Sequence, residues 1–135
     1  MPTGYSGTRL AKKLSLKPGQ RAWWENVPDS VRAEIAPDEI GLELLPSPEP
    51  PIDAAHVFVV TRAALEDCVA RLRPLLAPAG FLWVSWPKKA SKVPTDVTED
   101  VLRDVALPTG LVDVKVCAVD ATWSALKLMI RRELR

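Results

Sequence analysis

The sequence predicts an α/β domain with an open, mainly parallel sheet of about six strands and helices on both faces. Strand-like and helix-like segments alternate through residues 20–106, and two long alternating segments, 112–119 and 123–132, close the chain as an antiparallel hairpin. The 135 residues suffice for one domain with its own core. We therefore expect a single domain over residues 1–135, with residues 1–19 as an N-terminal arm.

The first third of the chain contains short elements. The apolar and aromatic run "QRAWWENV" at 20–27 is typical of a strand, and "GLELL" at 41–45 alternates as a second strand. Between them, Asp29 or Ser30 is expected to cap a helix over 30–36. The string "LAKKL" predicts one further short helix inside the arm.

The central segment has the clearest pattern. "HVFVV" at 56–60 is a continuous β-branched and aromatic run, which is typical of a strand buried on both faces of a parallel sheet. Thr61 then caps a helix predicted over 62–77, whose apolar residues recur at helical spacing. We expect "PAG" at 78–80 to end this helix and "FLWVSW" at 81–86 to form a second buried strand.

A last helix is expected between the second buried strand and the hairpin. Asp96 and Glu99 fit a capping box for "VTEDVLRDVAL". Val97, Val101 and Val105 recur at helical spacing, so they are expected to share the face that packs on the core.

Composition restricts the classes of function. The formal net charge is +1, so the whole molecule is not built to coat nucleic acid or an anionic membrane, and such a partner would need a local patch. Cys68 and Cys117 lie far apart without a CxxC motif, which favours free thiols in a reducing cytosol. No apolar run approaches the ~20 residues that span a bilayer. We expect a cytoplasmic protein with no membrane partner.

The sequence indicates no catalytic or metal site. His56 is the only histidine, so neither a His-based triad nor a two-histidine metal site can be assembled within one chain. Its place at the start of an apolar strand favours a structural imidazole, with Asp53 as its partner or as a simple loop residue. We therefore name no catalytic residue, no metal ligand and no cofactor.

One loop suggests a binding function. "WPKKASKVPTD" at 86–96 places three lysines directly after a buried strand and before a helix. Ligands of open α/β sheets lie beyond the carboxyl ends of the strands, and cations with hydroxyls and helix amides suit a phosphate or carboxylate. The candidate anion-binding residues are Asn26, Trp86, Lys88, Lys89, Ser91, Lys92 and Thr95. A solvated surface loop is the alternative, because Asp96, Glu99 and Asp100 add negative charge at the same helix end.

The order of elements resembles the Rossmann-like fold of class I S-adenosylmethionine-dependent methyltransferases. "LKPGQRAWW" resembles the lead-in to the first strand, "IDAAHVFVV" the fourth strand, and "LRPLLAPAGFLWVSW" the following helix, loop and fifth strand. The hairpin resembles strands six and seven. The resemblance implies an acidic, glycine-rich cofactor turn after the first strand. Here that turn is "WENVPDS", in which Pro28 lacks an amide donor and no glycine permits a close approach.

A second departure concerns length. Only about ten residues separate 41–45 from 56–60, too few for a crossover helix and a third strand. In the resemblance Glu43 takes the place of the acidic residue that holds the cofactor ribose, but its position inside the strand favours an exposed residue. "GYSGT", "WPKKASKVPTD" and "GLVDVKVCAVD" also resemble a short bacterial family, a domain of unknown function that implies no activity.

Three functions remain open at this point. The glycine-free turn favours a non-catalytic binding or interaction module with an unidentified protein partner. The lysine-rich loop supports a second hypothesis, an enzyme or sensor for a small anionic metabolite or nucleotide. RNA binding through the same loop is the third hypothesis, and the near-neutral net charge argues against it.

Overall fold

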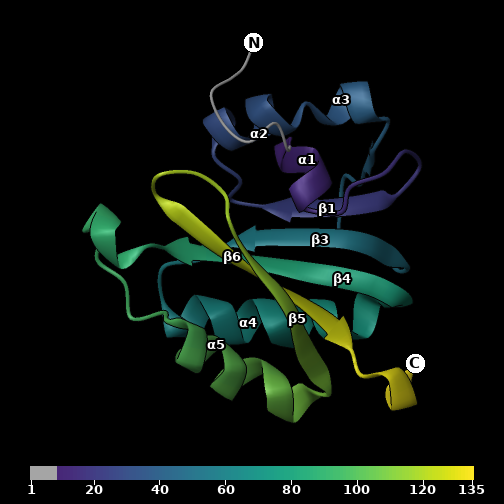
Figure 1. Cartoon of the computed structure of the whole chain (residues 1–135). Coiled ribbons are helices and arrows are strands. Elements are labelled where there is room, and N and C mark those ends of the chain that lie inside the picture. The colour runs from purple at the N-terminus through teal and green to yellow at the C-terminus, as the bar shows by residue number, and fades with distance from the viewer. Residues whose placement is uncertain (1–8) are drawn as a thin grey trace.

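A computed structural model describes residues 9–135 as a six-stranded sheet with helices on both faces (Figure 1). The strands are β1 (Arg21–Glu25), β2 (Glu43–Leu44), β3 (Ile52–Phe58), β4 (Leu76–Pro87), β5 (Leu111–Ala118) and β6 (Trp123–Ile130). They lie in the order β2-β1-β3-β4-β6-β5. The first four are mutually parallel, and β6 is antiparallel to both of its neighbours. The predicted mainly parallel sheet with a C-terminal hairpin is confirmed.

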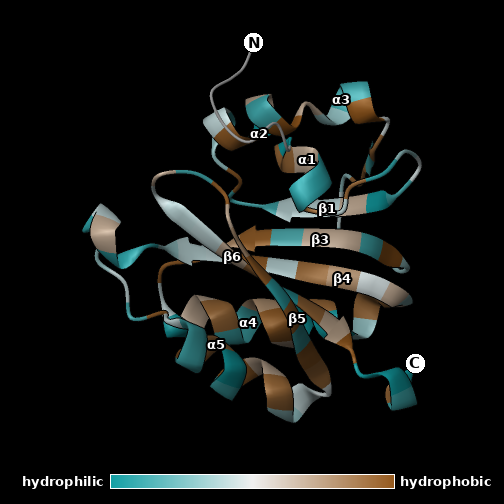
Figure 2. Cartoon of the chain, in the orientation of Figure 1, coloured by the Kyte–Doolittle hydropathy of each residue, from teal (hydrophilic) through white to brown (hydrophobic). Residues whose placement is uncertain are grey.

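The helices form a layer on each face of the sheet. One layer contains α1 (Leu10–Lys13), α2 (Asp29–Ile35) and α3 (Pro37–Ile40), and the other contains α4 (Arg62–Leu72) and α5 (Glu99–Ala106) (Figure 1). Each layer encloses its own hydrophobic core, and Figure 2 shows hydrophobic residues along the central strands. Trp23 packs against one core and Trp24 against the other, because successive strand residues point to opposite faces.

The helix α4 is shorter than the helix predicted over 62–77. It ends at Leu72, a 3-10 turn covers Arg73–Leu75, and β4 already begins at Leu76. Pro74 lies in the turn, and it has no amide hydrogen to continue the helical ladder. The prediction for the last part of this helix is therefore wrong.

The segment 78–80, expected to end that helix, is part of β4. A Cβ atom on Gly80 would lie 2.5 Å from the carbonyl oxygen of Ile52. Side chains do not tolerate such a short contact, so β4 passes the start of β3 only with glycine at this position. This glycine marks the close approach of two strands.

Of the three predicted helix caps, only that of α4 is confirmed. Thr61 caps α4 as expected, because its hydroxyl accepts a backbone N–H of the first helical turn at 3.1 Å. The cap of α5 is Thr98, which accepts the N–H of Val101 at 3.2 Å, so the predicted capping box is wrong. Asp96 instead accepts the backbone N–H of Arg62 at 2.7 Å and ties the loop before α5 to the start of α4.

The face that α5 buries is rotated from the predicted one. Leu102 and Ala106 are fully buried, whereas Val101 and Val105 pack against the same core from partly buried positions. Val97 is buried in the loop before the helix, so it reaches the core without belonging to the helical stripe.

The region between β1 and β3 is compressed. Pro28 occupies the cap position of α2, so neither Asp29 nor Ser30 caps this helix. The helix α3 has no counterpart among the expected elements, and β2 contains two residues instead of the predicted segment 41–45. Residues 45–51 connect β2 to β3 without a helix, which agrees with the expected absence of a crossover.

No helix within residues 9–135 has the length and apolar character needed to cross a membrane.

Candidate functional site

The strand β1 ends in a carboxylate that other side chains hold firmly. Arg71 of α4 donates to the two oxygens of Glu25 at 2.9 and 3.0 Å, and Trp23 Nε1 donates at 2.7 Å. Cys68 Sγ lies 3.6 Å from the same carboxylate. The hydrogen bonds from Arg71 lower the pKa of Glu25, although partial burial acts in the opposite direction. Glu25 therefore anchors β1 to α4.

The turn after β1 contains residues with side chains. Glycine at these positions would leave the backbone accessible to a ligand. Asn26 has a φ of 59°, and its amide nitrogen lies 3.5 Å from the carbonyl oxygen of Phe58. Pro28 supplies no amide hydrogen. A cofactor turn of the methyltransferase type needs bare backbone at this place, so these residues do not fit S-adenosylmethionine. Glu43 does not fit a ribose contact either, since it starts β2, is exposed and pairs with Arg21 at 3.4 Å.

A buried polar pair joins β3 to β4. His56 Nε2 lies 2.7 Å from Ser85 Oγ, and the imidazole stacks on Phe58 with ring centroids 4.6 Å apart. Burial lowers the pKa of His56 to about 3, so the imidazole is neutral at neutral pH. Asp53 accepts the backbone N–H of Arg21 at 2.8 Å, so its carboxylate binds the first residue of β1. This environment is that of a structural histidine.

Both cysteines are free thiols in positions that disfavour the thiolate. Burial, with the nearby charge of Glu25, raises the pKa of Cys68 to about 11. Burial also raises the pKa of Cys117. The thiolate is the reactive form of cysteine, so neither residue is set up as a nucleophile. Among residues 9–135 no group of histidine, cysteine, aspartate or glutamate could hold a metal ion.

The lysine-rich loop borders a pocket of about 580 Å³ beyond the carboxyl end of β4. Its lining consists of Trp86, Pro87, Lys88, Lys89, Thr95, Val97, Thr98, Glu99, Asp100 and Ser124. Four of the seven residues predicted from the sequence are thus brought together. Trp86 is only 7% exposed and packs in the core, which leaves little ring area for stacking on a ligand.

The other three predicted residues do not line this pocket. Ser91 shapes the loop, since its hydroxyl donates to the carbonyl oxygen of Lys88 at 2.6 Å and accepts the N–H of Val93 at 3.2 Å. Lys92 follows a 3-10 turn with a φ of 62° and is exposed. Asn26 lies at the end of β1, away from the pocket lining.

Thr95 lines the pocket, but both hydrogen bonds of its hydroxyl are made to the backbone. It donates to the carbonyl oxygen of Val60 at 2.7 Å and accepts the N–H of Val97 at 3.0 Å. The first bond holds the loop against the segment that follows β3, and the second shapes the loop itself. Lys88 and Lys89 are therefore the predicted residues with polar groups free for a ligand.

The sequence indicated negative charge at this helix end, which the structure places in the pocket lining, but it did not indicate the contribution of β6. Glu99 and Asp100 come from the first turn of α5, and the carboxylate of Glu99 pairs with Arg103 at 3.0 Å. Ser124 reaches the pocket because β6 returns antiparallel to β4 and places it opposite Trp86. The pocket consequently has mixed charge, with lysines from the loop and carboxylates from α5.

Lysine and arginine are used differently in this protein. The ion pairs within residues 9–135 are made by Arg21, Arg62, Arg71 and Arg103. No lysine of the described chain is in one of these pairs. The lysine ammonium groups, including those of the pocket, are therefore charges without carboxylate partners.

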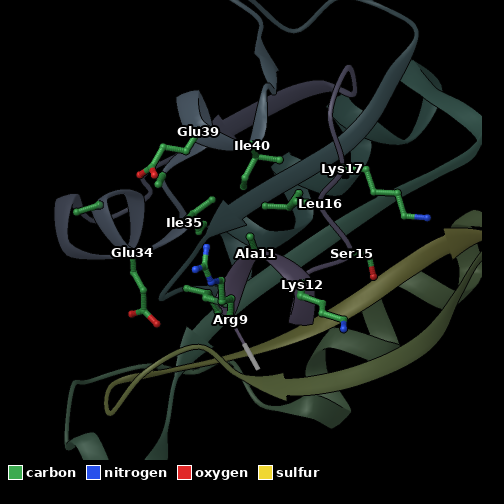
Figure 3. Close-up of a pocket in the computed structure, with 13 residues that line it drawn as sticks. Arg9, Ala11, Lys12, Ser15, Leu16, Lys17, Glu34, Ile35, Glu39 and Ile40 are labelled. Atoms are coloured by element: carbon green, nitrogen blue, oxygen red, sulfur yellow. The ribbon is translucent and has the colours of Figure 1, made fainter. Parts of the chain in front are cut away.

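A second pocket, of about 520 Å³, lies between α1 and the pair α2–α3 (Figure 3). Leu16 and Ile35 contribute apolar lining. Figure 3 shows Lys12 and Lys17 on one side of it and Glu34 on the other. The sequence pattern did not indicate this pocket, because its lining comes from separate short helices.

The motif "GYSGT" lies outside the described residues.

Solved structures that share this fold include methyltransferases. A SAM-dependent methyltransferase from Aquifex aeolicus is similar with a TM-score of 0.62 and 14% identity, over 90% of this chain and 87% of that chain. The CcbJ methyltransferase from Streptomyces caelestis gives a TM-score of 0.59 and 9% identity, over 90% and 88%. TrmN from Thermus thermophilus gives 0.56 and 14%, and the 90% of this chain that aligns spans only 47% of TrmN.

These likenesses show a methyltransferase-like α/β fold and confirm the fold that the sequence resemblance implied. No protein-family model matches the chain, and no curated protein matches it. The resemblance to a short bacterial family stays a prediction.

Proposed function

We propose that this methyltransferase-like domain is a non-catalytic binding module. The turn after β1 carries the proposal. There Glu25 is already bound by Arg71 and Trp23, and Asn26 and Pro28 replace the bare backbone that the cofactor of the fold requires.

The reactive side-chain types of the chain support the same proposal. The single histidine is buried, neutral and bonded to Ser85. Burial keeps the thiols of Cys68 and Cys117 protonated at neutral pH. General acid–base and nucleophilic catalysis need groups that titrate near the working pH or that carry an activating partner, and these three residues have neither property.

Isothermal titration calorimetry with S-adenosylmethionine tests this function. We expect no saturable heat at millimolar cofactor, because the turn offers neither glycine backbone nor a free carboxylate. S-adenosylhomocysteine serves as a second probe of the same turn. A dissociation constant in the micromolar range for either compound would overturn the proposal and restore methyl transfer as the leading hypothesis.

A small anionic ligand in the pocket beyond β4 is the second candidate. Lys88 and Lys89 line this pocket and carry no carboxylate partner, which favours a phosphate or carboxylate group. Glu99 and Asp100 line it as well, so we expect the ligand to carry a hydrogen-bond donor beside its anionic group. Nucleoside monophosphates and amino-sugar phosphates have this combination.

Thermal unfolding in the presence of these phosphates tests the second candidate. A ligand at ~100 times its dissociation constant adds about 2.7 kcal/mol, which raises the Tm by several degrees for a chain of this size. We expect the rise in the wild type and in Lys92→Ala, whose side chain does not line the pocket, and its loss in Lys88/Lys89→Ala. An equal rise in all three proteins would exclude the pocket as the site.

A further inference from the structure

A second group of lysines lies on the opposite layer from the pocket beyond β4. It comes from α1, the loop after α1 and both strands of the hairpin, and we name it the α1–hairpin lysine patch: Lys12, Lys13, Lys17, Lys115 and Lys127. Hydrogen bonds connect its parts. The Nζ atom of Lys13 donates to the carbonyl oxygen of Ala118 at 2.9 Å, and that of Lys127 donates to Ser15 Oγ at 3.0 Å.

Lys127 links the hairpin to the loop after α1 and lies near Lys115 and Lys17. Its Nζ atom lies 4.6 Å from the ring centroid of Phe81 and 6.0 Å from that of Trp83, so the ammonium rests on the aromatic surface of the core. Partial burial, together with the charges of Lys115 and Lys17, lowers the pKa of Lys127. A partly desolvated cation among like charges is unfavourable by itself, and a bound anion relieves it.

Acidic residues lie near the patch, but none of them forms an ion pair with its lysines among the described residues. Asp113, on the same strand as Lys115, is paired with Arg103 at 3.1 Å. In the pocket beside α1, Figure 3 shows Glu34 and Glu39 on the side opposite Lys12. The formal net charge of +1 therefore still leaves a group of lysines that no neighbouring carboxylate pairs with.

We propose that the α1–hairpin lysine patch binds the phosphate backbone of a nucleic acid. Its lysines are spread over a helix, a loop and two strands, and Lys13 and Lys115 already donate to backbone oxygens, at 2.9 and 3.5 Å. They do not converge on one small anion. A chain of phosphates presents spaced charges that match this spread. The site is separate from the pocket beyond β4 and goes beyond the proposed binding module.

The residue type favours nucleic acid over an acidic protein. Lysine is depleted from protein–protein interfaces, whereas lysine contacts to phosphates are common in nucleic-acid complexes. Lysine also acts as a point charge, without the planar fork that reads a base edge. The patch therefore contacts the phosphate backbone of the nucleic acid and not its bases. Its affinity depends on salt concentration and is independent of base sequence.

Fluorescence anisotropy with a labelled single-stranded RNA and a DNA duplex, both of mixed sequence, tests this inference. If all five lysines contact phosphates, a plot of log affinity against log salt has a slope of about −3.5 for the single strand and about −4.5 for the duplex. The variant Lys12/Lys17/Lys115→Gln removes three exposed charges of the patch. We expect its slope on the single strand to be shallower by about 2.

The other lysine group provides a matched control. Lys88/Lys89/Lys92→Gln changes the net charge by the same amount, and we expect it to keep the wild-type slope. Equal losses in the two variants, or no binding by the wild type at low salt, would overturn the proposal. Poly-glutamate that binds as tightly as the nucleic acids would replace it with an acidic protein partner. Circular dichroism melting of each variant verifies that it is folded.

Discussion

The carboxyl ends of β1 and β4 lie at the same edge of the sheet but are built in opposite ways. At β1 a carboxylate is enclosed by Arg71 and Trp23, and the following turn is filled by the side chain of Asn26. At β4 two lysines without carboxylate partners line a pocket. The comparison teaches that one end of a parallel sheet can be closed by side-chain contacts while a neighbouring end stays open, with the strand order unchanged.

The largest expected effect is the pH dependence of stability that His56 causes. This residue lies on β3, the strand between β1 and β4. The pKa of His56 is about 3 in the folded protein and near 6.5 in the unfolded chain. Between these values the unfolded chain binds more protons, so stability is retained above pH 6.5 and lost as the pH falls. We expect a loss of about 1.4 kcal/mol per pH unit.

Urea unfolding between pH 7 and 4.5 measures this slope before most carboxylates titrate. The variant His56→Gln keeps a hydrogen-bonding side chain beside Ser85 but has no proton to bind in this range, so its slope should be flatter. Identical slopes for the two proteins would show that other groups cause the acid sensitivity.

An intermediate effect contrasts the closed and the open end directly. Glu25→Ala leaves the Trp23 N–H and the Arg71 guanidinium without their acceptor, and we expect it to destabilise the fold by about 2 kcal/mol. Arg71 is 42% exposed, so water compensates part of the loss. Lys88→Ala should stay within about 0.5 kcal/mol of the wild type. Chemical denaturation that finds equal costs would remove the contrast between the two ends.

The smallest effect concerns the turn that follows β1. Asn26 has a φ of 59°, a conformation that costs alanine about 1 kcal/mol and costs glycine almost nothing. We expect Asn26→Ala to lower the free energy of unfolding by about that amount and Asn26→Gly to leave it nearly unchanged. If the glycine variant is as unstable as the alanine variant, the bond to the Phe58 carbonyl determines stability at this turn.

Local patterns predicted the centre of the sheet because its strands are long and uninterrupted. Residues 56–59 and 81–86 are buried, although β3 spans Ile52–Phe58 instead of the predicted 56–60, and Val60 lies exposed beyond its end. The end of α4 was not predictable in the same way. Leu72 and Leu76 keep the helical spacing, but the close approach of Gly80 to Ile52 favours an early start of β4. That contact is tertiary and has no local signature.

The candidate site was predictable as far as it is local. Lys88 and Lys89 line one pocket with Trp86 because all three follow or end the same strand. Ser124 was missed, since only the antiparallel return of β6 brings it there. The α1–hairpin lysine patch was missed for the same reason, as Ser15 and Lys127 are 112 positions apart in the chain.

The two-residue strand β2 has a consequence for local opening. Its attachment to β1 includes the backbone bonds from Glu43 N to the Gln20 oxygen, at 2.9 Å, and from Leu45 N to the Ala22 oxygen, at 2.8 Å. Few bonds have to break for this edge to separate, whereas β3 and β4 are paired on both sides. Amide hydrogens of β2 should therefore exchange with solvent through local opening, and those of β3 only through global unfolding. The shortened connection thus makes one edge of the sheet the least protected part of the strand network.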